Sequence, residues 1–186
     1  MILDRKRLIG WILFVVCILL IPFVAMRFTD KINWEFTDFL IMGIALSAMG
    51  FAYELIVRKS KKTVYRIAFI TGLLGAFLLF WVNGAVGIIG SENQDANLLY
   101  GAVFVVGLVG SFVSRFKAKG MSITLVVTSI VQMLVPTIAI IIWPPSKTSW
   151  SPSVVGVFLL SGFFAFLFYL SSMLFKHSAG SEMKLS

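Results

Sequence analysis

Residues 121–143 read MSITLVVTSIVQMLVPTIAIIIW, a run in which apolar side chains predominate and no side chain carries a charge. A helix needs about 20 mostly apolar residues to cross the hydrocarbon core of a bilayer. The run is long enough for such a helix, and it lacks the strict alternation of apolar and polar residues that marks a barrel strand. It therefore predicts a transmembrane helix.

Five further apolar runs flank this one, and each has the length of a spanning helix. They comprise Leu8–Met26, Asp38–Val57, Ile67–Ile89, Leu98–Ser114 and Val154–Phe175. Hydrophobic residues make up 59% of the chain and charged residues only 13%, against about 25% charged in soluble domains. The sequence predicts an all-α protein, a polytopic transmembrane bundle of about six spanning helices over residues 1–176. The small polar tail, residues 177–186, is predicted to be disordered.

The net charge of +8 has the size expected of a nucleic-acid-binding protein, but not the placement. Lys and Arg lie between the apolar runs, so the expected partner is the lipid bilayer and not nucleic acid. Most of them gather near the N-terminus, around residues 58–66 and 115–119, and after the last run. Only Arg27, Lys31 and Lys147 lie at the opposite helix ends. The positive-inside rule then predicts that both termini lie in the cytoplasm.

Small residues recur at intervals of four in several of the runs. Examples are Gly43 with Ser47, Gly72 with Ala76, and Gly107 with Ser111. This spacing lets helix backbones approach closely in a membrane. It fits packing within one bundle, and it also fits a homo-oligomer or a membrane partner protein; both remain open.

Polar residues in the middle of an apolar run are candidate functional sites. Gln132 lies at the centre of run 121–143, with Thr128 one turn before it and Pro136 one turn after. Pro136 cannot donate to the Gln132 carbonyl, so a kink, a freed carbonyl and an amide meet near the midplane. We expect these residues, together with Asn83, to line a substrate or ion path. The alternative is a healed kink in which Gln132 forms an interhelical hydrogen bond of about 0.5–2 kcal/mol.

The densest polar stretch, residues 81–100, contains no Lys or Arg. Its two carboxylates, Glu92 and Asp95, are ligands of the kind that Ca²⁺ and Mg²⁺ prefer, and Asp38 at the start of the second run could join them. These three residues are the candidate metal ligands. The alternative is a tight turn in which Asp95 or Asn97 caps the fourth helix.

The same stretch resembles a group of small bacterial inner-membrane proteins of unassigned function. The shared segment is Val-Asn-x-Ala-Val-Gly-Ile-Ile-Gly-Ser-Glu followed by Ala-Asn-Leu and a Tyr, which are here Val82–Glu92, residues 96–98 and Tyr100. The resemblance implies a multi-pass protein of the bacterial cytoplasmic membrane. It brings no activity and no functional residue with it.

Residues for covalent or metal catalysis are scarce. The chain has one histidine, His177, which lies in the tail beyond the last apolar run, and one cysteine, Cys17. A Ser/His/Asp triad and a zinc site with several His or Cys ligands are therefore not expected. No cofactor is expected. We therefore expect a non-enzymatic membrane protein, either an accessory subunit or a small transporter or channel. The alternative is a membrane enzyme or lipid-modifying protein that uses the extracytoplasmic acidic loop.

Overall fold

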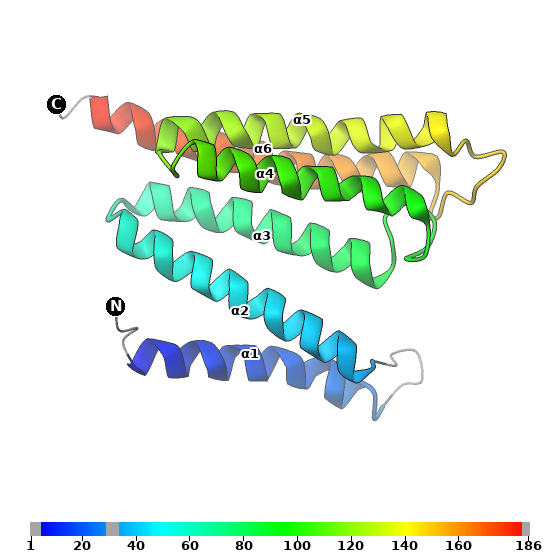
Figure 1. Ribbon diagram of the computed structural model, residues 1–186, viewed down its shortest axis with the longest axis horizontal. Helices are drawn as coiled ribbons and strands as arrows, with labels where there is room; N and C mark the ends of the chain where they lie inside the picture. Colours follow the sequence, from blue (N-terminus) through cyan, green and yellow to red (C-terminus); the bar gives the residue numbers. More distant parts are fainter. Residues whose placement is uncertain (1–4, 29–33, 184–186) are drawn as a thin grey trace. The chain divides into compact units, whose positions relative to one another are not determined.

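The chain folds into α-helices joined by short connections (Figure 1). The computed structural model describes residues 5–28 and 34–183, and no strand occurs within these ranges. The elements are α1 (Arg5–Ala25), α2 (Phe36–Lys59), α3 (Thr63–Ala85), the 3₁₀ helix η1 (Asp95–Tyr100), α4 (Gly101–Val113), α5 (Ala118–Ile142) and α6 (Val154–Met183). The predicted all-α polytopic bundle is confirmed.

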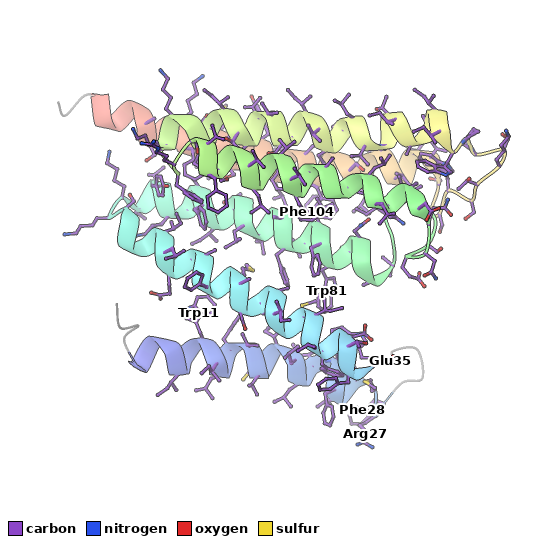
Figure 2. The ribbon with its side chains drawn as sticks, viewed as in Figure 1. Trp11, Arg27, Phe28, Glu35, Trp81 and Phe104 are labelled. Carbon is purple, nitrogen blue, oxygen red and sulfur yellow. The ribbon has the colours of Figure 1, made fainter. Side chains whose placement is uncertain are left out.

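Five of the helical segments are long and apolar enough to cross a membrane. They are Phe36–Ile56, Thr63–Ala85, Asp95–Val113, Ala118–Ile142 and Val154–Gly180. The first helix is apolar over Ile9–Ala25, which is a shorter stretch. Apolar side chains project from the helices as Figure 2 shows, and many of the largest ones are exposed, as a lipid environment requires. The protein is therefore a multi-pass integral membrane protein.

The chain divides into two compact units, residues 1–59 and residues 60–186. The first unit is a hairpin of α1 and α2. In the hairpin the Trp11 ring packs on Gly50, where an added Cβ atom would lie 2.9 Å from the ring. The Trp11 and Tyr53 rings meet edge to face, with centroids 5.9 Å apart. The hairpin is thus held by contacts of its own.

The second unit contains α3 to α6, and we call it the four-helix unit. Within it α6 packs against both α3 and α5, and α4 packs against α5. Connections 86–94 and 143–153 lie at the same end of the unit (Figure 1), which we call the Asn97 end. At the opposite end the Tyr65 hydroxyl donates a hydrogen bond to the Phe116 carbonyl.

Small residues bring the helices of the four-helix unit close together. A Cβ atom added to Gly72 would lie 2.9 Å from the hydroxyl oxygen of Ser171 on α6. One added to Gly110 would lie 2.5 Å from the methyl carbon of Thr124 on α5. Glycine therefore sets the separation of α3 from α6 and of α4 from α5. Packing within the bundle is thus observed at Gly72, and oligomerisation stays a prediction.

The ends of the third and sixth helices differ from those that the sequence predicts. The third helix ends at Ala85 and not at Ile89, because the backbone turns at Gly87 with φ +71°. The sixth helix continues past Phe175 to Met183, so residues 177–183 are helical where we expected disorder. Ser178 is fully buried like Phe175, which shows that the packed face of the helix extends beyond the apolar run. Residues 184–186 lie outside the described part of the chain.

Candidate functional site

The interior of the four-helix unit contains a series of buried polar side chains. They are Asn97, Ser122, Thr124, Thr128, Ser129, Gln132, Ser161, Ser171, Ser172 and Ser178. Helix α5 contributes half of them. None carries a charge, and no Asp, Glu, Lys or Arg is buried among the described residues of this unit. We call this series the polar seam.

Within α5 the hydroxyl groups bind carbonyls of their own helix. Thr128 Oγ1 donates to the Thr124 carbonyl at 2.9 Å, and Ser129 Oγ donates to the Val126 carbonyl at 2.7 Å. Such bonds satisfy the hydroxyl proton without help from another helix. The oxygen lone pairs stay available to accept a further hydrogen bond.

Other hydroxyls of the seam connect two helices. Ser172 Oγ donates to the Ser122 carbonyl at 2.8 Å, which joins α6 to α5. Ser171 Oγ donates to the Ala68 carbonyl at 2.6 Å, which joins α6 to α3. These residues are therefore interhelical hydrogen-bonding residues, the structural use of polar side chains in a membrane bundle.

Gln132 differs from Thr128, Ser129, Ser171 and Ser172, whose hydroxyl groups all donate hydrogen bonds. Its side chain is 0% exposed, and neither Oε1 nor Nε2 has a hydrogen-bond partner among the residues that the structure describes. A buried donor or acceptor without a partner costs about 1–3 kcal/mol. Pro136 is also fully buried, and because it has no N–H the Gln132 carbonyl lacks its usual helical donor. Polar atoms that lack their usual partners thus meet at one residue.

The helix register shows what lies near Gln132. The hydroxyls of Ser122 and Ser172 are 3.2 Å apart and align α5 with the antiparallel α6. Gln132 lies ten residues after Ser122 on α5. Because α6 runs in the opposite direction, the matching position on α6 lies about ten residues before Ser172, in the turn that contains Ser161. Ser161 and the Tyr100 hydroxyl share a hydrogen bond of 2.7 Å, and both side chains are fully buried. Gln132 and this hydroxyl pair therefore lie at one level of the unit.

Three of the four predicted path residues come together in the structure. Thr128, Gln132 and Pro136 follow one another at intervals of four on the buried face of α5. Asn83 lies near the end of α3 and is half-buried. Its Nδ2 donates to the Asn97 carbonyl at 3.3 Å, and its buried Oδ1 has no partner in the described ranges. Asn83 thus belongs to the Asn97 end.

Asn97 clamps the connection between α3 and η1. Its Oδ1 accepts from the N–H groups of Ile88 and Ile89 at 3.1 and 2.9 Å. Its Nδ2 donates to the carbonyls of Ile89 and Ser91 at 3.1 and 2.7 Å. The alternative prediction that Asp95 or Asn97 caps the fourth helix is wrong, because neither η1 nor α4 has a side-chain cap. The amide binds the preceding loop instead.

The clamped loop buries two apolar side chains that sequence reasoning missed. Ile88 and Ile89 are each 0% exposed. They lie between Gly87 and Gly90, whose φ angles of +71° and +76° favour glycine. A Cβ atom on Gly90 would lie 2.7 Å from the Ser149 carbonyl, so this loop packs against the α5–α6 connection. The sequence signal for this buried loop is the pair of adjacent isoleucines between two glycines, Gly87 to Gly90.

The three predicted metal ligands divide between the two compact units. Glu92 and Asp95 are exposed at the Asn97 end. Asp38 lies in the hairpin, where its Oδ2 accepts from the Glu35 N–H at 2.8 Å. No group of three or more His, Cys, Asp or Glu that could hold a metal occurs in residues 5–28 and 34–183. The metal site therefore stays a prediction.

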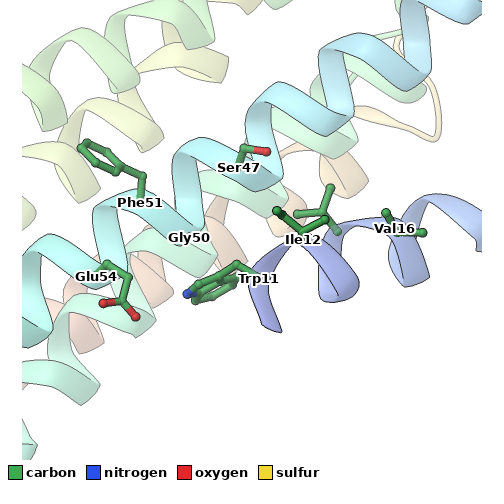
Figure 3. A pocket seen from close by; sticks show the side chains of 8 residues that line it. Trp11, Ile12, Val16, Ser47, Gly50, Phe51 and Glu54 are labelled. Carbon is green, nitrogen blue, oxygen red and sulfur yellow. The ribbon is translucent and has the colours of Figure 1, made fainter. Parts of the chain in front are cut away.

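The hairpin contains a groove of its own between α1 and α2. Its lining is shown in Figure 3 and consists of Trp11, Ile12, Val15, Val16, Ser47, Gly50, Phe51 and Glu54. The groove has a volume of about 270 Å³ and is mostly apolar. Glu54 is buried near its Trp11 side. A lining of this kind is compatible with lipid, which surrounds any such helix pair.

No protein-family model, curated protein or solved structure matches the chain. The indications of function therefore come from the chain's own side chains. Among them the unpartnered amide of Gln132 is the feature that packing explains least.

Proposed function

We propose that this membrane protein is a small transporter or channel in which a polar solute passes Gln132 inside the four-helix unit. The observation that supports the proposal is the fully buried Gln132 amide, which has neither a donor nor an acceptor partner among the described residues. A polar group that is costly within a membrane and has no structural partner is a candidate for a solute path.

A purely structural role would require a hydrogen bond that the described residues do not supply. If Gln132 served to hold helices together, its amide would bind a neighbouring helix as Ser172 and Ser171 do. Leu or Met would fill the same space without the desolvation cost of an amide. The residue therefore stabilises the closed bundle less than an apolar side chain of similar volume.

The surroundings of Gln132 fit a place where a solute is held. Pro136 interrupts the hydrogen-bond ladder of α5 one turn away, and interrupted helices form the binding sites of many transporters. The polar seam continues from Gln132 along α5 to Ser122, so polar groups extend from the amide toward the end opposite Asn97. In the described state the amide is enclosed, and we propose that the solute enters when the helices part.

The test compares Gln132→Leu and Gln132→Met with Thr137→Val in purified, reconstituted protein. Thr137 is exposed on α5 and its hydroxyl donates to the Met133 carbonyl of the same helix, so its replacement is a matched control. Solute flux into vesicles should be lost in both Gln132 variants and kept in the control. Melting temperatures of the Gln132 variants should be equal to or above wild type. Unchanged flux in Gln132→Leu would overturn the proposal.

The location is proposed on separate grounds. The basic residues at one set of helix ends and the resemblance to bacterial inner-membrane proteins support the bacterial cytoplasmic membrane, with both termini in the cytoplasm.

A further inference from the structure

We infer that the solute at Gln132 is a small neutral molecule that offers a hydrogen-bond donor and acceptor side by side, as water, a polyol or a small amide does. The inference rests on the proposed function and names its substrate class. It follows from the two unpartnered atoms of the amide and from the absence of charge in the described part of the polar seam.

The amide group requires two complementary partners. Oε1 can only accept a hydrogen bond and Nε2 can only donate one. An inorganic cation would bind Oε1 and leave the Nε2 protons unpaired and repelled. An anion would bind Nε2 and leave Oε1 unpaired. A hydroxyl group or an amide donates and accepts together, so a solute of this class satisfies both atoms at once.

The side chains at the level of Gln132 supply further contacts of both kinds. Thr128 has its proton bound to the Thr124 carbonyl, so its oxygen can only accept from a solute. Tyr100 and Ser161 have two O–H groups between them, and their mutual bond uses only one. The remaining O–H can donate to a solute. A solute with several hydroxyl or amide groups would find both acceptors and a donor here.

The electrostatics of the unit argue against an ion. A charge within a membrane is stabilised by an opposite charge or by a ring of oriented dipoles. The described residues of the four-helix unit bury no charged side chain. The seam hydroxyls that donate to main-chain carbonyls occupy acceptors that a cation would need. A neutral solute has no such requirement.

The test uses the full-length protein in vesicles of phosphatidylethanolamine and phosphatidylglycerol. Stopped-flow light scattering measures water efflux driven by sucrose, and swelling in glycerol or urea. A fluorescent indicator measures Na⁺ and K⁺ entry in the same vesicles. We expect wild-type protein to accelerate water, glycerol or urea flux over protein-free vesicles. The pattern among the three identifies which member of the class is carried.

Two variants separate the neutral solute from a cation. Gln132→Leu should reduce the neutral flux about tenfold or more, because it removes both hydrogen bonds. Gln132→Glu keeps the shape and the acceptor but replaces the donor, so it should also reduce the neutral flux. Melting temperatures of both variants are measured to confirm folding, with Gln132→Met as the apolar replacement of similar length if Gln132→Leu is unstable.

The outcomes distinguish this inference from the proposed function. Cation entry that depends on Gln132 and is kept or raised by Gln132→Glu, without neutral flux, would overturn the neutral class and leave transport standing. Flux equal to that of protein-free vesicles for every solute would overturn both. Neutral flux that Gln132→Leu leaves unchanged would show that the solute passes elsewhere.

Discussion

The side-chain amide of Asn97 binds both polar groups of the Ile89 backbone, accepting from its N–H at 2.9 Å and donating to its carbonyl at 3.1 Å. The Asn97 amide thus supplies Ile89 with the acceptor and the donor that a neighbouring β-strand would supply. It allows a loop with buried isoleucine side chains to keep its main chain satisfied.

Replacement of Asn97 should therefore weaken the Asn97 end. Asn97→Ala removes four hydrogen bonds to the loop and leaves buried N–H groups unpaired, so we expect a loss of roughly 2–4 kcal/mol in unfolding free energy. Unfolding in detergent followed by circular dichroism measures it. Asn93→Ala changes an exposed amide of the same loop and should shift stability by no more than about 0.5 kcal/mol. Equal effects of the two changes would contradict the clamp.

Gly90 should not tolerate a side chain. In Gly90→Ala the new Cβ would meet the Ser149 carbonyl, and the φ angle of +76° adds strain. We expect a loss of about 1–3 kcal/mol, measured as above. Gly84→Ala is the control, because nothing lies within 4 Å of an added Cβ there and the position is helical. That change should stabilise by up to about 1 kcal/mol. A neutral Gly90→Ala would show that the loop does not pack on the α5–α6 connection.

The hydroxyl pair of Tyr100 and Ser161 should show measurable coupling. A double-mutant cycle of Tyr100→Phe and Ser161→Ala isolates their hydrogen bond from the loss of packing. Interhelical bonds in membrane proteins average about 0.6 kcal/mol and reach about 1.7 kcal/mol. We expect a value in the upper part of that range, because both side chains are fully buried. Strictly additive single effects would argue against the bond.

The predicted orientation can be tested with reporter fusions. A reporter that is active only in the cytoplasm should work after Ser186, since the basic residues place that end inside. A reporter that is active only outside should work when inserted at Asn93. A silent cytoplasmic reporter at Ser186, with protein present in the membrane, would show that the number or direction of the spans is wrong.

The sequence predicted the helices well and the loop badly, for a physical reason. Helix α5, expected over Met121–Trp143, is observed over Ala118–Ile142. A long uncharged apolar run without alternation satisfies its backbone groups in lipid by forming a helix. Hydropathy extends the third predicted helix through Ile89 because Ile88 and Ile89 are as apolar as the residues before them. The positive φ angle of Gly87 ends the helix before these two isoleucines, and hydropathy contains no information on that angle.

The sequence predicts which residues form the candidate site, but not whether the Gln132 amide has a hydrogen-bond partner. Gln132, Pro136 and Thr128 were identified from spacing along one helix. Whether the amide has a partner depends on the register of α5 against α4 and α6, which no local pattern determines. The same limit explains why Asn83 was grouped with Gln132: both are polar residues in apolar runs, and only the packing of η1 shows that Asn83 bonds Asn97.

The hydroxyl groups that bind carbonyls of their own helix have a mechanical consequence. Thr128 and Ser129 keep their hydrogen bonds however α5 is positioned, because donor and acceptor travel together. A shift of α5 along its neighbours would therefore leave these two hydroxyl groups satisfied. Only the contacts between helices, such as Ser122 with Ser172, oppose such a shift.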